Sequence, residues 1–341
     1  MQLAIIIVSY NVGALLRACL ESLLAGLART PELAAEVWVV DNASADGSAA
    51  MVRADFPQVR LIASPENLGY SAGNNLALQL VGFPPLAGEA RPLSAYPWAA
   101  GLPHGQQRPR YVWLLNPDTV VRGDAPAQLV RFLDQTPTAG ACGAQLCYAD
   151  GSFQHGAFRF PGLAQLGLDF FPPPGRLNQP LLDSRLNGRY SRQLYDQSQP
   201  FPVDFVLGAT LLARGETLRQ VGLLDEGYFM YCEEMDWQRR AQQAGWAVYC
   251  VPSARVVHVA GASSSQFRSR SFVALWQSRL RYFRRHHGPL FNRTAAALLR
   301  AGLRAEARRV RRQSPSNLDE RLAAYRAVEA LTSGAGPLEQ P

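Results

Sequence analysis

The amino-acid sequence predicts an α/β fold with a mainly parallel sheet, and two observations support this prediction. Short apolar segments alternate with segments of helical apolar spacing through roughly the first 80 residues. Polar residues follow several of the apolar segments at the point where each ends, and ligands bind beyond the carboxyl ends of parallel strands. The strand-helix order implies a parallel sheet with right-handed crossover connections.

The first 115 residues account for most of this pattern. We expect strands over 3–8, 36–40, 59–63 and 112–115, and helices over 15–27, 47–54 and 70–80. Residues 82–109, between the last helix and the last strand, show no hydrophobic periodicity of a helix or strand, and they contain six prolines and four glycines. This composition predicts a surface insertion.

The second half begins with a similar pattern and becomes helical towards its end. We expect helices over 125–133 and 235–244, and strands over 141–148, 153–158, 203–213, 247–251 and 255–259. Asp150-Gly151 predicts a hairpin turn between two of these strands. The pattern predicts that residues 160–202 form a second irregular insertion. Insertions of this kind often make lids or binding loops. From about Arg268 the chain is helical and rich in arginine.

The formal charge of +7 hides a strong asymmetry. Between Arg268 and Arg312 there are thirteen arginines and one acid, Glu306, so this stretch carries +12 and the remainder 7 − 12 = −5. All 34 basic residues are arginine. Such a stretch could face phosphate groups, nucleic acid or an anionic membrane, or it could be a solvated helical face.

Cysteine content and the N-terminal segment predict a cytoplasmic protein. The five cysteines lack C-x-x-C pairs and zinc-ligand spacing, so we expect reduced thiols. The apolar segment 3–8 is too short to span a membrane, and no basic segment precedes it as in a signal peptide. We therefore expect the chain to begin directly with a buried strand.

The segment after the strand at 112–115 carries the most informative motif, Asn116-Pro117-Asp118. It lies where ligands gather in open α/β sheets, so Asp118 is a candidate for binding a metal and a diphosphate. All three residue types also favour ordinary turns. Taken alone, the motif leaves both interpretations open.

Two further motifs follow the first strands. Asp41 could accept hydrogen bonds from a nucleobase or a ribose, whereas Asp46 is better explained as the N-cap of the next helix. Residues 66–75 form a helix entrance of small residues, where free backbone N–H groups favour a phosphate or a polar sugar. A tight turn with close helix packing is the alternative.

The last motifs are acidic and imidazole groups. Glu233, Glu234 and Asp236 concentrate three carboxylates in four residues beside apolar neighbours, and partial burial would raise a carboxyl pKa towards the range of a general base. Asp236 could instead be a structural cap. His258 ends a strand and is a potential ligand, although a lone histidine is more often structural.

These motifs, in this order, resemble the inverting nucleotide-sugar glycosyltransferases of the GT-A fold, in particular the rhamnosyltransferase-like branch of glycosyltransferase family 2. The resemblance spans roughly residues 1 to 288. Its motifs are Ser9-Tyr10-Asn11, Asp41-Asn42-Ala43-Ser44, the segment 67–74, Asn116-Pro117-Asp118, Glu233-Glu234-Met235-Asp236 and His258. Each motif is weak alone, but six in sequence are specific.

The resemblance implies a GT-A type, Rossmann-like nucleotide-binding fold, with a mixed, mainly parallel sheet flanked by helices and a helical C-terminal extension. The catalytic domain would cover 1–265, with a nucleotide-sugar half over about 1–120 and an acceptor half over about 121–265. An arginine-rich helical region would cover 266–335.

The resemblance also implies roles for single residues. Residues implied to bind the donor are Ser9, Tyr10, Asn11, Asp41, Asn42, Asn67, Gly69, Gly73, Asn74, Asn116 and Asp118. Asn116 and Asp118 stand for the family's D-x-D motif, and a divalent ion, Mg²⁺ or Mn²⁺, is implied on Asp118 with help from His258. Glu234 falls at the general-base position, with Glu233 and Asp236 as alternates.

Two departures from the family pattern keep a second hypothesis open. Asn116 replaces the first acid of the D-x-D motif, and an amide oxygen is a weaker ligand for a hard cation. Glu234 replaces the usual aspartate base. A nucleotide-sugar-binding or scaffolding subunit without catalysis is therefore the alternative. A nucleotidyltransferase is disfavoured, because no glycine-rich, basic loop follows the first strand.

The resemblance implies inverting transfer of a sugar to a hydroxyl, with dTDP-rhamnose or a UDP-sugar as the donor. The acceptor is expected to be a glycan or a lipid-linked molecule in cell-surface polysaccharide synthesis. No nucleic-acid partner is expected, and nothing in the sequence defines an oligomeric state. The arginine-rich stretch could add peripheral contact with an anionic membrane at its cytoplasmic face.

Overall fold

The computed structural model describes residues 2–86, 88, 90–102, 104–105, 107–259, 268–313 and 316–333. The chain divides into two compact units. The sheet unit comprises Met1–Phe158, Arg192–Gly227 and Glu233–Ser263, and the helical unit comprises Arg159–Ser191, Tyr228–Cys232 and Ser264–Pro341. The division into domains over 1–265 and 266–335 stays a prediction.

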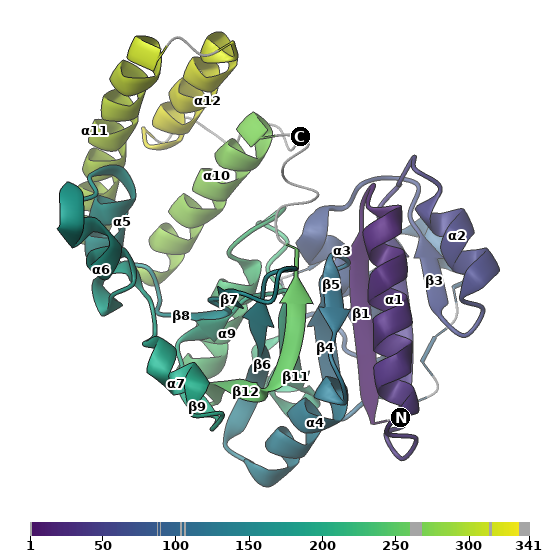
Figure 1. Ribbon diagram of the computed structural model, residues 1–341. Coiled ribbons are helices and arrows are strands. Elements are labelled where there is room, and N and C mark those ends of the chain that lie inside the picture. The colour runs from purple at the N-terminus through teal and green to yellow at the C-terminus, as the bar shows by residue number, and fades with distance from the viewer. Residues whose placement is uncertain are drawn as a thin grey trace. The chain divides into compact units, whose positions relative to one another are not determined.

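A ten-stranded mixed sheet forms the sheet unit, with the strand order β3-β2-β1-β4-β11-β6-β12-β5 (Figure 1). Its parallel half consists of β1 (Leu3–Ser9), β2 (Ala35–Asp41), β3 (Arg60–Ala63) and β4 (Tyr111–Leu115). Its other half consists of β11 (Thr210–Arg214), β6 (Ala139–Cys147), β12 (Ala247–His258) and β5 (Thr119–Val121). Here β12 runs parallel to β6, whereas β11 and β5 run antiparallel to their neighbours. The expected mixed, mainly parallel sheet is confirmed.

Four short strands complete the β structure. β7 (Phe153–Gln154) pairs with β6, and β9 (Phe201–Val203) pairs with β12. β8 (Ala157–Phe158) and β10 (Phe205–Val206) form a separate two-stranded sheet. The expected hairpin turn at Asp150-Gly151 joins β6 to β7, and Gly151 has the positive φ of 83° that suits it.

Helices cover both faces of the sheet, which explains why the central strands are apolar on both sides. Tyr111, Trp113 and Leu115 of β4 join the core beneath α1 (Gly13–Ala28) and α4 (Ala125–Gln135). Val112 and Leu114 point to the opposite face, where α3 (Gly69–Leu80), α8 (Gly215–Val221) and α9 (Glu233–Gln243) pack. α2 (Ser48–Asp55) links β2 to β3.

The structure corrects four expectations about elements. Residues 119–121 form β5 and residues 215–221 form α8, whereas no element is expected at either place. The two strands expected over 247–251 and 255–259 are one strand, β12, with an irregular register between Val251 and Arg255. The strand expected over 203–213 is divided among β9, β10 and β11.

The two insertions differ. Residues 82–109 contain only two short 3-10 turns among the residues described there, Leu93–Ala95 and Pro97–Ala99. Residues 160–202, expected to be irregular, contain α5 (Leu163–Phe170), α6 (Asn178–Leu182) and α7 (Arg192–Asp196), with 3-10 turns at Gly175–Leu177 and Arg185–Asn187. These helices are short and have prolines near their ends, so the sequence shows no clear helical periodicity there.

The helical unit is built from α10 (Arg268–His286), α11 (Pro289–Gln313) and α12 (Leu318–Leu331), with α5 against α11 (Figure 1). The ring of Phe170 stacks on Trp276 with centroids 5.3 Å apart. A Cβ at Gly302 would lie 2.2 Å from the Phe170 ring, so only glycine allows this packing. The apolar stripe of α10 is thus buried inside the helical unit. In the part of the chain that the structure describes, no helix combines the length and hydropathy needed to cross a membrane.

Candidate active site

The carboxyl ends of β1, β2 and β4 meet at one edge of the sheet, as the parallel order requires. Ser9 lies opposite Asp41 in the register of β1 and β2, and β4 ends directly before Asn116. The Ser9 hydroxyl is fully buried and has no hydrogen-bond partner. This edge brings together the first, second and fourth predicted motifs.

Asn11 ties the loop after β1 to the loop after β2. Its backbone N–H donates to Ser44 Oγ at 3.0 Å, and its side-chain Oδ1 accepts from the Ala45 N–H at 2.8 Å. Asn11 and Ala43 both have positive φ, 53° and 63°. Backbone strain of this kind concentrates at functional sites. Tyr10 is half-buried at the same loop.

Asp41 and Asn42 are adjacent but are used differently. Asp41 is 3% exposed; its Oδ2 accepts from the Ser44 N–H at 3.1 Å, while its Oδ1 is buried without a partner. Asn42 is fully engaged, because it donates to the Gly69 carbonyl at 3.0 Å and accepts from the Leu68 N–H at 3.3 Å. Asp41 therefore retains an acceptor for a ligand, and Asn42 positions the entrance of α3.

Asp46 has a structural role, but it is not the N-cap expected from the sequence, because Gly47 holds that position before α2. Its carboxylate accepts from the backbone N–H groups of Gly13 and Ser48, at 2.8 and 3.0 Å, at the starts of α1 and α2. Burial opposes ionisation, but the hydrogen bonds from Ser48 and Gly13 outweigh it and lower the pKa of Asp46.

The entrance of α3 combines packing with one unpartnered acceptor. Asn67 Oδ1 accepts from the N–H of Gly69, which has a φ of 79°. A Cβ at Gly73 would lie 3.0 Å from Val8 Cγ1, so Gly73 lets α3 approach β1 closely. Asn74 donates to the Tyr70 carbonyl at 2.9 Å, and its Oδ1 is buried without a partner. Both alternatives for this motif, close packing and ligand binding, thus find support.

The turn after β4 holds two unpartnered oxygens. The Asn116 N–H donates to the Ala209 carbonyl at 3.2 Å, and the Asn116 carbonyl accepts from Thr119 Oγ1 at 2.7 Å, which fixes the turn. The side-chain Oδ1 atoms of Asn116 and Asp118 are buried and have no hydrogen-bond partner among the described residues. Burial raises the pKa of Asp118, and the nearby His258 only partly offsets this.

His258 reaches Asp118 because β12 pairs with β5, with His258 opposite Thr119. Its Nε2 lies 3.5 Å from Asp118 Oδ1, and its Nδ1 lies 3.2 Å from Gln154 Oε1 on β7. With the Gln154 oxygen as acceptor, Nδ1 carries the proton and Nε2 presents a lone pair on the side of Asp118. Burial lowers the pKa of His258, which favours this neutral form.

Asp118 and His258 suit a divalent cation. A carboxylate oxygen and an imidazole lone pair lie side by side without a proton between them, which leaves two acceptors with no donor. No group of three or more His, Cys, Asp or Glu side chains able to hold a metal occurs among the described residues. Mg²⁺ commonly binds through one or two protein ligands, with waters and substrate phosphates completing the shell. The residues present therefore fit such an ion.

Glu233 and Glu234 begin α9, directly after two residues of positive φ, Tyr231 at 72° and Cys232 at 66°. The Oε2 atom of each glutamate is buried without a partner. Burial raises the pKa of both carboxyls, and the charge of Glu234 raises that of Glu233 further. Contacts with backbone groups, including those of Gly208 and Met235, partly offset the shift of Glu234. A raised carboxyl pKa suits a general base.

Tyr70, at the start of α3, is a site residue that the sequence interpretation missed. Its hydroxyl donates to the Gly208 carbonyl at 3.1 Å. Burial, then the charges of Glu233 and Glu234, and more weakly that of Asp118, raise its pKa. Tyr70 therefore lies within electrostatic reach of both the α9 carboxylates and the β4 turn. Its place in the segment 66–75, between Asn67 and Asn74, is the signal in the sequence that points to it.

Asp236 and Gln238 anchor α9 instead of facing the unpartnered groups. Asp236 is fully buried and pairs with Arg240 at 2.9 Å, and Arg240 also donates to the carbonyls of Val221 and Leu223. This pairing favours the structural role that the sequence offered as the alternative for Asp236. Gln238 exchanges two hydrogen bonds of 2.8 Å with the Val206 backbone and donates to the Glu234 carbonyl at 2.9 Å. Gln154 and Gln238 were both missed by the sequence interpretation.

Comparison with known proteins finds similarity to glycosyltransferases. The sequence model of the family described as Glycosyl transferase family 2 matches residues 4–82, the stretch from β1 through α3. The N-acetylglucosaminyl-diphospho-decaprenol L-rhamnosyltransferase of Mycobacterium tuberculosis is 31% identical over 256 residues, which cover 75% of each chain. Rhamnosyltransferase WbbL of Escherichia coli K12 is 25% identical over 179 residues, 51% of this chain and 62% of that protein.

The fold is also shared with a solved structure. The mannosyltransferase PcManGT of Pyrobaculum calidifontis, in complex with GDP-Man and Mn²⁺, superposes with a TM-score of 0.52 at 16% identity, covering 99% of this chain and 76% of that one. This likeness supports the GT-A type fold expected from the sequence. Because a relative above 30% identity matches three quarters of both chains, the chain belongs to glycosyltransferase family 2 and is a glycosyltransferase.

Proposed function

We propose that this enzyme transfers a sugar from a nucleotide diphosphate donor to a hydroxyl of a glycan or lipid-linked acceptor, with inversion at the anomeric carbon. One observation carries the proposal: buried polar atoms without partners gather at the carboxyl edge of the parallel strands and at the start of α9. These atoms belong to Ser9, Asp41, Asn74, Asn116, Asp118, Glu233 and Glu234, seven of the twenty such side-chain atoms among the described residues. Because unpaired buried polar groups are costly, seven of them on the loops and helix starts around this edge support a ligand site.

The donor would lie along the edge formed by β1, β2 and β4. Asp41 Oδ1 would accept from a ribose hydroxyl or a base N–H, because carboxylates only accept hydrogen bonds. Tyr10, half-buried at the next loop, would contact the nucleoside. Asn74 and Asn116 offer amide groups for sugar hydroxyls and the diphosphate.

Asp118 and His258 would hold a divalent ion, Mg²⁺ or Mn²⁺. When bound, such an ion neutralises charge on the departing diphosphate. Asn116 Oδ1 lies on the same turn and could add a weaker oxygen ligand. The neutral tautomer of His258, with its proton on Nδ1, suits this role.

Glu234 would be the general base that takes the proton of the acceptor hydroxyl. It is half-buried, whereas Glu233 is 4% exposed, so Glu234 is the more accessible of the two acids. Its pKa is raised by burial, which makes its carboxylate more basic. Gln238 and the Gly208 loop hold the first turn of α9 in place.

The donor is proposed to be a nucleotide-linked rhamnose, with dTDP-rhamnose ahead of UDP-sugars. The two relatives compared above are both rhamnosyltransferases, and one acts on N-acetylglucosaminyl-diphospho-decaprenol by its name. A lipid-linked diphosphate sugar is accordingly the acceptor class we propose, in the synthesis of a cell-envelope polysaccharide.

A thermal-shift panel of nucleotide sugars tests this proposal, because a ligand stabilises the folded state in proportion to its occupancy. We expect dTDP-rhamnose with Mn²⁺ to raise Tm the most, and Asp118→Asn to remove the Mn²⁺-dependent part of the shift. Asp124→Asn, on an acid that pairs with Gln128 at the start of α4, is the control. No shift with any nucleotide sugar would reject the proposal.

A binding subunit without catalysis is the second candidate, and Asn116 in the D-x-D position favours it. Donor hydrolysis distinguishes the two. Slow release of dTDP from dTDP-rhamnose, dependent on Mn²⁺ and abolished by Asp118→Asn, would show an intact leaving-group site. Donor binding with no such release, and no transfer to a lipid-linked acceptor, would support the binding subunit.

A further inference from the structure

One face of α11 in the helical unit is exposed along the whole helix and carries no acid. Exposed positions recur at spacings of three or four residues, at Leu290, Arg293, Ala297, Ala301, Arg304, Arg308 and Arg312. The opposite side of the helix is buried through Ala295, Leu299, Leu303 and Val310. Leu290 is 79% exposed, the largest value among the exposed large apolar residues described. We call this exposed row the α11 face.

The C-terminal part of the α11 face is strongly basic. Five arginines and one acid, Glu306, lie between positions 304 and 312. Arg304 pairs with Glu329 at 2.8 Å and Arg309 with Glu306 at 3.4 Å, yet their side chains remain 65% and 67% exposed. No partner is described for Arg308 or Arg312. Positive charge at a helix C-terminus is favourable, but this number exceeds what capping needs.

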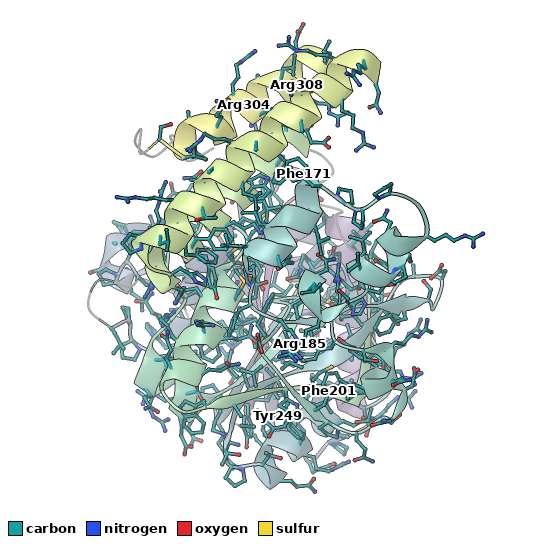
Figure 2. All side chains as sticks on the ribbon, turned by 90° about the vertical axis from the view of Figure 1, so that its left-hand side faces the viewer. Phe171, Arg185, Phe201, Tyr249, Arg304 and Arg308 are labelled. Atoms are coloured by element: carbon teal, nitrogen blue, oxygen red, sulfur yellow. The ribbon has the colours of Figure 1, made fainter. Side chains whose placement is uncertain are left out.

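The helical unit also has an exposed aromatic residue, Phe171. Phe170 packs on Gly302, which belongs to the buried side of α11, and Phe171 follows it directly after the end of α5. Phe171 is 47% exposed, and prolines 172 to 174 follow it. Figure 2 shows Arg304 and Arg308 on α11 and Phe171 at the end of α5, in the upper part of the same view. The α11 face itself therefore combines the arginines with one large exposed apolar side chain, Leu290.

We propose that the α11 face is a docking surface for the phospholipid headgroups of an anionic bilayer. The charge complementarity is direct, because arginine binds phosphate oxygens through a planar pair of donors. A basic helix with an exposed Leu290 suits an interface in which the apolar side chain enters the bilayer and the arginines stay at the phosphates. This inference goes beyond the proposed function and does not depend on the identity of the donor.

Co-sedimentation of the full chain with vesicles tests the docking surface. The probes are vesicles of phosphatidylcholine alone, and of phosphatidylcholine with 30% phosphatidylglycerol, each at low salt and at 0.5 M NaCl. We expect binding to the anionic vesicles at low salt, strong weakening at high salt, and little binding to phosphatidylcholine alone, since the attraction falls off with the Debye length.

Two variants separate the α11 face from the net charge of the chain. Arg308→Gln with Arg312→Gln removes two charges from the face. Each arginine removed should lower vesicle affinity about fivefold, so the double variant should bind roughly 25-fold more weakly. Arg53→Gln with Arg131→Gln removes two exposed charges from the sheet unit and serves as the matched control, expected to bind almost as the wild type. Leu290→Ser is expected to weaken binding at both salt concentrations, since its contribution is apolar. Circular dichroism and Tm confirm that each variant is folded.

Three results would overturn the proposal. One is no binding of the wild type to anionic vesicles at low salt. Another is an equal loss in the α11 double variant and the sheet-unit control, which would mean non-specific charge attraction. The third is binding to a single-stranded oligonucleotide at concentrations where vesicles are not bound, with the same dependence on Arg308 and Arg312, which would assign the face to nucleic acid.

Discussion

Two kinds of buried carboxylate lie within four residues of α9, and they behave differently. Asp236 is fully buried and satisfied by Arg240, which also donates to two backbone carbonyls. Glu233 and Glu234 are buried or half-buried, yet each keeps an oxygen without a partner and a raised pKa. All three are carboxylates in the first turn of α9, and the presence or absence of a partner is what separates them.

The presence or absence of a partner indicates whether a buried carboxylate contributes to stability or to the reaction. A paired buried carboxylate holds the helix in place, and removing one partner leaves an uncompensated charge. An unpaired buried carboxylate destabilises the fold and persists where a reaction uses it. Asp118 belongs with the glutamates, because its Oδ1 is also unpartnered and burial raises its pKa. The site is therefore the place where the fold leaves carboxylates unsatisfied.

The largest expected effect is on turnover. Glu234→Gln should lower kcat by about 10²- to 10⁴-fold, because an amide cannot accept the acceptor proton, while donor binding by thermal shift stays unchanged. Glu216→Gln, at an exposed acid in the first turn of α8, is the matched control. Full turnover in the Glu234 variant would show that another residue is the general base, and Glu233 would be tested next.

The second effect is on stability and concerns the paired carboxylate. Asp236→Asn should lower the free energy of unfolding by about 3 to 5 kcal/mol, because the Arg240 charge is left without its counter-ion in a largely buried position. Turnover per folded molecule should change far less than in the Glu234 variant. Urea unfolding and kcat measured on the same preparation separate the two.

The exposed pair of Glu306 and Arg309 provides the control for this stability prediction. Glu306→Gln should change stability by less than about 1 kcal/mol, because the pair is solvated. A turnover loss in Asp236→Asn as large as that of Glu234→Gln, with stability unchanged, would instead place Asp236 in the chemistry.

Local pattern predicted the parallel half of the sheet well, because those strands are continuous apolar runs covered on both faces. Local pattern failed for strands whose pairing partners lie far away in the sequence. β5 has only three residues, and its partners at 256–258 lie more than 130 positions later in the chain. β12 looked like two strands because Pro252 and Ser253 interrupt the apolar run, whereas the structure continues it through an irregular register.

The candidate site shows the same limit. Sequence motifs pointed to Asp41, Asp118, Glu234 and His258 as candidates, because acids and imidazoles at the ends of strands and the starts of helices are informative by type. The partners that hold them were not recognisable. Gln154 contacts His258 across 104 positions, and Tyr70 reaches Gly208 across 138. A glutamine on a two-residue strand has no signature in sequence, since its role depends on which side chain the fold places beside it.

The next prediction concerns the partner of His258. Gln154→Leu should weaken Mn²⁺ binding in the presence of dTDP by about 10- to 100-fold, because His258 loses the acceptor that keeps its proton on Nδ1. Gln154→Glu retains an acceptor and should bind Mn²⁺ at least as well as the wild type. Electron paramagnetic resonance of free Mn²⁺ measures both. Equal weakening in the two variants would mean that Gln154 serves only packing.

The smallest expected effect is the pH dependence that an unpaired carboxylate gives to stability. Burial, and then the charge of Glu234, raise the pKa of Glu233 well above its ordinary 4.5. Between pH 4.5 and the raised value, the unfolded chain has lost this proton while the folded chain still holds it, so stability falls as pH rises.

The variant Glu233→Gln tests this pH dependence. Its amide side chain cannot titrate, so the variant does not lose stability in this way. The free energy of unfolding of the variant relative to wild type should therefore increase as pH rises from 4.5, and level off above the folded pKa. Urea unfolding between pH 4 and 8 measures this difference, with Glu216→Gln as the exposed control. A difference that does not change with pH would show that Glu233 is satisfied in the folded protein, and it would then belong with Asp236.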